Sequence, residues 1–284
     1  MKIHHLNCGT MREVDPGNKG PGYAAAVVNH CLLIEFDEGR LVLVDTGFGT
    51  GDIVDPPGAL GQTFLARTQP KLRSAEVAAN QIRAIGLNPA DLTDIILTHL
   101  DVDHSGGLPD FPDALVHVHE AELKAALSST HAHPEHDVRY RPAHWAHGPK
   151  WVEYASSRDL SWFGMDAIQL LGIPSDIVLV PLAGHTEGHC AVAVRNGERW
   201  ILHAGDAFYH HGEIDVANRW TLPIWEQLEE VTEVDRPLRL GNHARLRELV
   251  RDFSAEIDVI SAHDPWMFER SISDRLTAVP VSPS

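Results

Sequence analysis

Four side chains of the types that bind divalent metals stand within six positions of the stretch LTHLDVDHSGGLPDF, residues 97–111. They are His99, Asp101, Asp103 and His104. Imidazole nitrogens and carboxylate oxygens suit borderline and hard divalent cations, and an open coordination position lets such a metal hold a water. The small residues of HSGG permit the tight backbone that aims alternate ligands at one point. The stretch therefore predicts part of a metal site that can activate water.

Three more candidate ligands follow short apolar runs, as the first motif does. Four runs share this form, TDIILTH, DIVLVPLAGH, WILHAGD and IDVISAH, and each ends within a few residues in His or Asp. Runs of this length that are rich in leucine and β-branched residues indicate buried strands, and layered α/β folds build their sites in the loops beyond strand ends. We therefore expect the ligands to gather at one rim of the fold. The three are His185, Asp206 and His263.

The remaining pattern predicts one domain of alternating strands and helices. AAAVVNHCLLIEF and RLVLVDTG are expected to form a strand pair that turns at residues 37–39, and SAEVAANQIRAIGL has helical spacing, with Ser74 as N-cap and Gly86 near its end. Between residues 128 and 162 the periodicity is lost among five histidines and three prolines. Because that length is unusual for a simple connector, we expect a lid or a poorly ordered insertion within a single domain over residues 1–284.

Composition excludes several classes of protein. A chain of 284 residues with 43% hydrophobic content can bury a large core, and a formal net charge of −17 would repel nucleic acid. No apolar run approaches the roughly 20 residues that cross a bilayer, and the first residues do not resemble a signal peptide. The three cysteines lack paired spacing, whereas 19 histidines are a surplus typical of metal or proton chemistry. We expect a cytoplasmic enzyme without nucleic-acid or membrane partners, and a homodimer stays open.

In this order, HLDVDH, GHTEGH, HAGD and SAHD resemble the metallo-β-lactamase superfamily. The resemblance runs from DTG at Asp45 to His263 and implies an α/β fold, a four-layer αββα sandwich with a metal site at one edge. It implies that Asp45 braces a ligand by hydrogen bonding, although an Asp that merely forms the turn before Gly47 is a simpler alternative. It also implies that His189 supports a loop and binds no metal. The implied ligands are His99, Asp101 and His185 for one metal, Asp103, His104 and His263 for the other, and Asp206 as the bridge.

Asp101 departs from the superfamily pattern, which is HxHxDH where this chain has HxDxDH. A carboxylate could reach the metal that the middle histidine binds, and it adds one negative charge. Two divalent ions bring four positive charges, the aspartates 101, 103 and 206 return three, and a bridging hydroxide leaves the cluster neutral. We therefore expect two divalent metal ions with zinc as the first choice, and a shift toward iron or manganese because a neutral cluster is the weaker Lewis acid.

The most economical chemistry for such a site is attack of a metal-bound hydroxide on an electron-poor carbonyl. Tyr209, three positions after Asp206 in GDAFY, is similar to a tyrosine of the N-acyl homoserine lactonases that contacts the substrate carbonyl or leaving group. Its phenol could donate a hydrogen bond to an oxyanion, or its ring could only pack beneath the strand end. The expected enzyme is a metal-dependent hydrolase that opens a small-molecule lactone or cleaves another carboxylic ester, with Asp103 and Tyr209 as catalytic residues.

Two segments are expected to line the substrate pocket, HWAHGPKWVEY at residues 144–154 and the stretch DIVDPPGALGQTFL at residues 52–65. Two other activities of the superfamily stay open. Thioester hydrolysis of the glyoxalase II type would need a basic cluster for an anionic glutathione moiety, and the sequence shows no clear one. A di-iron redox protein resembling the flavodiiron core also has a carboxylate at the middle position, as HxExDH, but no flavodoxin-like domain is attached here to supply electrons.

Overall fold

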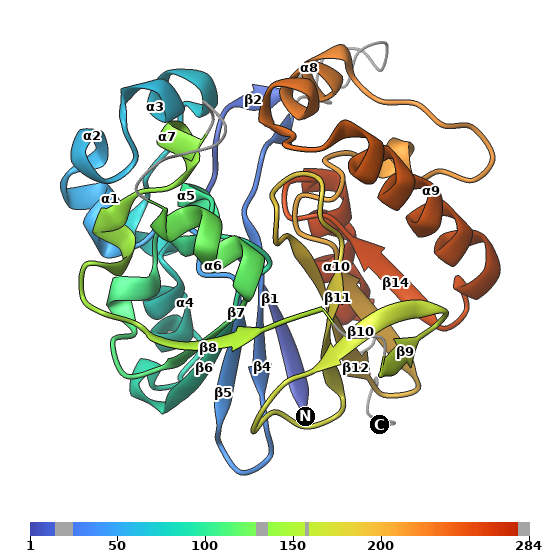
Figure 1. Cartoon of the computed structure of the whole chain (residues 1–284). Coiled ribbons are helices and arrows are strands. Elements are labelled where there is room, and N and C mark those ends of the chain that lie inside the picture. The colour runs from blue at the N-terminus through green and yellow to red at the C-terminus, as the bar shows by residue number, and fades with distance from the viewer. Residues whose placement is uncertain (15–24, 129–135, 157–158, 278–284) are drawn as a thin grey trace.

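Two stacked β-sheets with helices on their outer faces make up the computed structural model (Figure 1). It describes residues 1–14, 25–128, 136–156 and 159–277. Among these residues each main sheet has six strands, in the orders β1-β4-β5-β6-β7-β8 and β14-β13-β12-β11-β10-β9. The αββα sandwich expected from the sequence is therefore confirmed.

The strand pair expected around residues 37–39 is present as β4 (His30–Glu35) and β5 (Leu41–Val44). All four strands expected to end near His or Asp are also present, as β6 (Leu92–Ile96), β11 (Ile177–Pro181), β13 (Arg199–His203) and β14 (Ile257–Ile260).

In the first sheet β1 (Lys2–Asn7), β4 and β5 are antiparallel neighbours. The strands β6, β7 (Leu115–His119) and β8 (Lys150–Tyr154) continue this sheet in parallel. In the second sheet β14 (Ile257–Ile260) is parallel to β13 (Arg199–His203), and β12 (Cys190–Asn196), β11 (Ile177–Pro181), β10 (Met165–Gln169) and β9 (Leu160–Trp162) follow antiparallel. A small pair joins β2 (Glu13–Val14) to β3 (Ala25–Ala26).

The helix expected from Ser74 is instead a 3-10 turn, η1, followed by α4, because Val77 between them has an extended backbone with φ −62° and ψ 129°. The helices before β9 are α1 (Thr50–Val54), α2 (Pro56–Ala59), α3 (Gln62–Thr68), η1 (Ser74–Glu76), α4 (Ala78–Ala84), η2 (Pro89–Asp91), α5 (Val102–Ser105), η3 (Leu108–Asp110), α6 (Glu120–Leu127), α7 (His136–Arg139) and η4 (Pro142–Trp145). Those after β13 are η5 (His211–Glu213), α8 (Pro223–Thr232), α9 (Arg236–Phe253) and α10 (Pro265–Thr277).

Burial on both faces explains why the strands have nearly continuous apolar runs. Side chains alternate along β4, so that Leu33 packs in the core beneath α4 and α6 while Leu32 packs between the two sheets with Leu179 of β11. In the second sheet β11, β13 and β14 run in the same direction, because β12 is antiparallel to both β11 and β13. Their carboxyl ends therefore meet at one rim, where the candidate ligands follow.

The segment expected as a lid or insertion, residues 128–162, supplies α7, η4, β8 and β9, and its residues 129–135 and 157–158 lie outside the described ones. β8 is the edge strand of the first sheet and β9 the edge strand of the second, so this part of the chain passes from one sheet to the other (Figure 1). That it acts as a lid, and that residues 1–284 form a single domain, stay predictions. None of the described helices combines the length and apolar character needed to cross a membrane.

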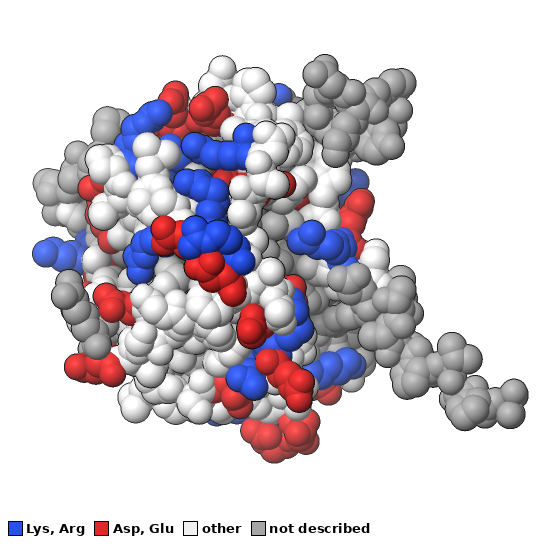
Figure 2. Space-filling view, turned by 90° about the vertical axis from the view of Figure 1, so that its right-hand side faces the viewer, with Lys and Arg blue, Asp and Glu red and all other residues white. Residues whose placement is uncertain are grey.

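The face that carries α9 has basic and acidic side chains closely interspersed (Figure 2). Exposed pairs at α9 include Arg236 with Glu230 at 2.8 Å and Arg251 with Asp252 at 2.7 Å, and pairs of this kind contribute little to stability. The helix is attached through its other face instead. The residues that α9 buries are Arg239, Asn242, His243, Leu246 and Leu249.

Candidate metal centre and its pocket

The seven predicted ligands converge from four strand ends into one buried cluster. The ligand atoms of His99, His185 and Asp206 lie within 4.8 Å of one another, and those of Asp103, His104 and His263 do the same. The strand ends determine this arrangement, since the loops after β6, β11, β13 and β14 each deliver part of the set. The grouping matches the division into two metal sites that the resemblance implied, with Asp101 to be placed separately.

Asp206 lies between the two groups and contacts both. Its Oδ2 is 3.2 Å from His263 Nε2 and 3.6 Å from His185 Nε2, and its Oδ1 is 3.2 Å from His104 Nε2. Asp206 Oδ2 thus lies near both groups while Oδ1 lies near the second, and a carboxylate between two groups has the placement that a bridging ligand needs.

Asp101 reaches the first group although its side chain is shorter than a histidine. Its Oδ2 lies 3.1 Å from His185 Nε2 and 3.6 Å from His99 Nε2. Asp101 is the N-cap residue of α5, and the next two ligands of the motif, Asp103 and His104, lie within this helix. Asp101 therefore lies next to the first group, although it is not among the three side chains whose ligand atoms all lie within 4.8 Å of one another.

Asp45 braces the second group, as the resemblance implied. Its Oδ1 accepts a hydrogen bond from Thr98 N at 2.8 Å, and its Oδ2 lies 2.7 Å from Thr98 Oγ1 and 2.9 Å from His104 Nδ1. Burial would raise the pKa of Asp45, but the neighbouring His104 lowers it below its ordinary value. Asp45 has a φ of 55°, a costly conformation for a residue other than glycine. These contacts fix the His104 ring so that Nε2 faces Asp206.

His189 has both ring nitrogens engaged within the loop, as expected for a residue that binds no metal. Its Nε2 accepts from Asp206 N at 3.0 Å, so Nδ1 carries the proton and donates to Leu182 O at 3.2 Å. Burial lowers its pKa well below the ordinary value, which keeps the ring neutral. Gly205 has a φ of +53°, and a Cβ there would lie 2.6 Å from His189 Nε2. The glycine of HAGD is thus required for this contact.

The chemistry of the donor set fits two divalent cations. His99 Nε2, Asp101 Oδ1 and Asp206 Oδ1 are buried and have no hydrogen-bond partner among the described residues. Burial raises the pKa of Asp103, and the nearby carboxylate of Asp206 contributes to the rise. Unpartnered buried atoms and crowded carboxylates both cost free energy, which cations held between them would offset.

Arg139 is a functional candidate that the sequence did not indicate. Its side chain is 4% exposed, and its Nη1 lies 3.4 Å from Asp101 Oδ1 and 3.1 Å from the carbonyl oxygen of His185. Its Nη2 donates to the carbonyl oxygen of Thr232. The charge sum made from the sequence was therefore incomplete, because this buried guanidinium adds one positive charge beside Asp101. With Arg139 the cluster has the same net charge that an HxHxDH site would have.

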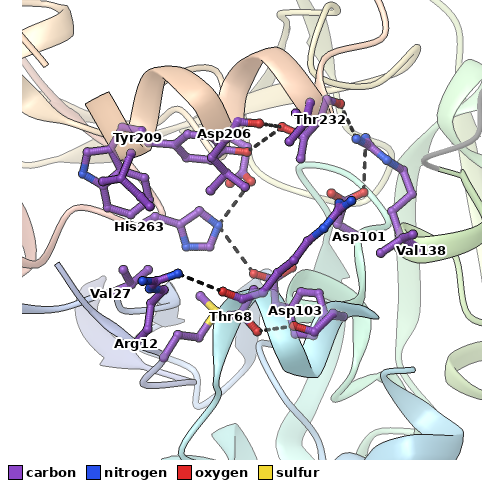
Figure 3. Close-up of a pocket in the computed structure, with 18 of the residues that line it drawn as sticks. Arg12, Val27, Thr68, Asp101, Asp103, Val138, Asp206, Tyr209, Thr232 and His263 are labelled. Atoms are coloured by element: carbon purple, nitrogen blue, oxygen red, sulfur yellow. Dashed lines mark hydrogen bonds and ion pairs between the residues drawn. The ribbon is translucent and has the colours of Figure 1, made fainter. Parts of the chain in front are cut away.

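A cavity of about 360 Å³ adjoins the ligands, and Asp101, Asp103, Asp206, Tyr209 and His263 are among the residues that line it (Figure 3). Of the two segments expected to line it, residues 52–65 contribute Phe64, but residues 144–154 contribute no lining residue and that prediction is wrong. β8 follows the edge of the first sheet instead, and His144 Nε2 is held by Asp52 Oδ1 at 2.8 Å. The apolar wall comprises Met11, Val14, Val27, Phe64, Val102, Val138, Ile224, Trp225, Leu228 and Val231.

Of the two roles that the sequence left open for Tyr209, packing is observed, and the residue also lines the cavity. Its ring packs against Trp225 with centroids 5.5 Å apart, and its Oη lies 3.4 Å from His185 Nδ1 and 3.3 Å from Thr232 Oγ1. Burial raises the pKa of the phenol well above its ordinary value, so the hydroxyl keeps its proton at neutral pH. It is therefore a hydrogen-bond donor at the wall of the cavity.

Known proteins resemble this chain in sequence and in fold. The chain is 42% identical over 271 residues to a probable metallo-hydrolase of Mycobacterium tuberculosis, a match that covers 95% of this chain and 82% of that protein. An N-acyl homoserine lactonase of Azorhizobium caulinodans is 26% identical over 254 residues, 87% of this chain and 86% of that protein. A solved N-acyl homoserine lactone hydrolase with N-hexanoyl-L-homoserine at its catalytic metal centre superposes with a TM-score of 0.63 at 22% identity, over 100% of this chain and 98% of that one.

The family model of the metallo-beta-lactamase superfamily matches residues 25–258, which include six of the seven candidate ligands. The seventh, His263, is the third residue after β14. Together with the 42% identical metallo-hydrolase and the αββα architecture, this match shows that the chain belongs to the metallo-β-lactamase superfamily of metal-dependent hydrolases.

Proposed function

We propose that this protein opens a lactone, or cleaves another carboxylic ester, whose acyl portion is apolar. The observation that carries the proposal is the cavity, which joins the ligand cluster and the Tyr209 phenol to a wall of apolar side chains. The lactonases among the relatives support the same class of substrate. We also propose that His99, Asp101 and His185 hold one divalent ion and that Asp103, His104 and His263 hold the second, with Asp206 as the bridge.

The side chains around the cavity have distinct roles in this proposal. When bound, the two divalent ions would supply a nucleophilic water at neutral pH and polarise the substrate carbonyl. The carboxylates of Asp103 and Asp206 face the cavity and would orient the attacking water by accepting its hydrogen bonds. The Tyr209 hydroxyl would donate a hydrogen bond to the oxygen on which negative charge develops.

The apolar wall would select the acyl portion. Trp225 and Leu228 of α8 face the cavity together with Val27 and Phe64, so an alkyl chain placed there leaves water for an apolar surface. Each buried methylene contributes about 0.8 kcal/mol, roughly a fourfold gain in kcat/KM per CH₂ until the wall is covered.

A hydrolysis panel with the metal-loaded protein tests the proposal. Acyl lactones and aryl esters of increasing chain length would be followed by a pH indicator, and we expect turnover that rises with chain length. Absence of turnover on the whole panel would disprove the ester assignment.

Acyl thioesters belong in the same panel because Arg12 and Arg67 also line the cavity and could face an anionic group. Oxygen uptake by the reduced iron form tests the di-iron alternative, which stays a prediction.

Replacing Tyr209 with phenylalanine should lower kcat by about 10²- to 10³-fold, since this is the usual effect of losing one oxyanion donor. The ring would still pack against Trp225, so metal content and thermal stability should change little. A matched control is Trp225→Phe, which alters the same ring pair but removes no donor to the substrate, and it should lower kcat less than about tenfold. Equal kcat for Tyr209→Phe and the wild type would limit Tyr209 to packing.

A further inference from the structure

A second group of potential ligands lies in the core where η5, α8 and α9 meet, outside the cluster described above. Glu213 ends η5, Glu229 lies in α8 and His243 lies in α9. One ligand atom from each falls within 4.8 Å of the others, and their residues are 0%, 4% and 0% exposed. Two carboxylates buried beside an imidazole are unusual, because ionised groups in a core normally have partners of opposite charge.

The two carboxylates have their outer oxygens held and their inner oxygens directed at the histidine. Thr221 Oγ1 donates to Glu213 Oε1 at 2.9 Å, and Arg239 Nη1 donates to Glu229 Oε2 at 2.8 Å. The inner oxygens, Glu213 Oε2 and Glu229 Oε1, lie 3.9 Å and 3.3 Å from His243 Nε2. Outer hydrogen bonds of this kind orient the ligands of protein metal sites. Glu213 Oε2 accepts one further, long bond from Tyr209 N at 3.4 Å.

His243 is the observation that points to a bound cation. Both its ring nitrogens and Glu229 Oε1 are buried without a hydrogen-bond partner among the described residues. The 3.3 Å between His243 Nε2 and Glu229 Oε1 is the distance of an ion pair rather than of a well-aligned hydrogen bond. It matches the separation of about 3.4 Å between two ligands that bind zinc tetrahedrally at roughly 2.0–2.2 Å.

The charges of the cluster favour the same conclusion. The Arg239 guanidinium forms ion pairs with Glu229 and Glu233, so its charge does not neutralise that of Glu213. Burial and the neighbouring Glu229 raise the pKa of Glu213 well above its ordinary value. A divalent ion between the two carboxylates would remove this repulsion and give the unpartnered histidine nitrogen a ligand to bind.

We propose that Glu213, Glu229 and His243 bind a third divalent metal ion of the zinc class, with a structural role. One imidazole and two carboxylates are a donor set that zinc accepts, and the site is closed to solvent. The ion would tie α8 and α9 to the loop that carries Tyr209. It would thereby hold Trp225 and Leu228, which line the cavity, in place beside the cluster of seven candidate ligands, the main centre.

Metal counting tests the third site. Protein loaded with zinc and dialysed against buffer should contain three zinc ions per wild-type chain by mass spectrometry, and His243→Leu should contain one fewer. The matched control is His211→Gln, because His211 Nδ1 is already paired with Asp264 Oδ2 at 2.8 Å in a neighbouring group of two histidines and one aspartate. The control should keep the wild-type count.

The outcomes separate this proposal from the proposed function. An unchanged zinc count in folded His243→Leu, relative to the wild type, would overturn the third site whatever the total count is, and the carboxylates would then be a pair that shares a proton. If His243→Leu does not fold, Glu213→Gln keeps the side-chain shape and should still lose one zinc, and an unchanged count there would have the same meaning. If the protein hydrolyses no ester, the proposed function fails, but the zinc count still decides whether the third site exists.

Discussion

Replacing Asp206 with asparagine is expected to lower ester hydrolysis by at least about 10³-fold and to release metal from the main centre. Loss of an outer partner of a ligand already costs 10- to 100-fold, and Asp206 contacts both groups of ligands directly. Asparagine has nearly the same shape but has one oxygen and no charge, so it cannot serve both groups. Kinetics on the best panel substrate and metal content by mass spectrometry check this result.

The control for Asp206→Asn is Asp258→Asn. Asp258 lies in β14, the strand beside β13, and its carboxylate forms an exposed ion pair with Arg199. That change should leave hydrolysis and metal content at wild-type values. Hydrolysis by Asp206→Asn within tenfold of the wild type, with full metal content, would rule out Asp206 as the bridge.

Asp101→His is expected to destabilise the metal-free protein by about 3 kcal/mol rather than simply to produce the common HxHxDH motif. Arg139 is nearly fully buried, and the change removes the carboxylate that faces its guanidinium. Arg139→Met should be costly for the converse reason, because it leaves Asp101 as a buried carboxylate without its cation. The double variant removes both charges, so its loss of stability should be clearly smaller than the sum of the single losses.

Urea unfolding of the four metal-free proteins measures this coupling. Arg141→Met is the control, since Arg141 is close in sequence but only partly buried, with an exposed hydrogen bond to Gly58 O, and we expect it to cost less than about 0.5 kcal/mol. Additive losses in the double variant would show that Asp101 and Arg139 are not a coupled pair.

The same variants should shift the pH–activity profile in opposite directions. Asp101→His makes the centre more positive by one charge, which favours the deprotonated form of the group that limits activity at low pH, so the acidic limb should move to lower pH. Arg139→Met makes the centre more negative and should move the limb to higher pH. The double variant has the wild-type net charge and should have nearly the wild-type profile. Metal preference should follow the net charge of the centre in the same way. The Arg139→Met centre, which is neutral, should be shifted most toward iron or manganese.

The sequence by itself determined the strands, the superfamily and the set of candidate ligands. Each of these depends on short-range information. A buried strand is an uninterrupted apolar run, and a ligand that follows a strand is adjacent to it in the chain, as His99 is to β6 and His263 is to β14. Strands of one sheet that run in the same direction end at the same rim, which brings His185, Asp206 and His263 together, whereas β6, which precedes His99, belongs to the other sheet.

Only the tertiary structure decided the charge of the centre, the lining of the cavity and the second cluster. Arg139 lies in a segment without periodicity, so nothing local marks it as the partner of Asp101. Residues 144–154 follow the edge of the first sheet, while α8 supplies much of the apolar wall. Glu213, Glu229 and His243 come from three separate helices, and their convergence depends on how those helices pack. Side-chain contacts between distant segments follow from packing, which no short stretch of sequence contains.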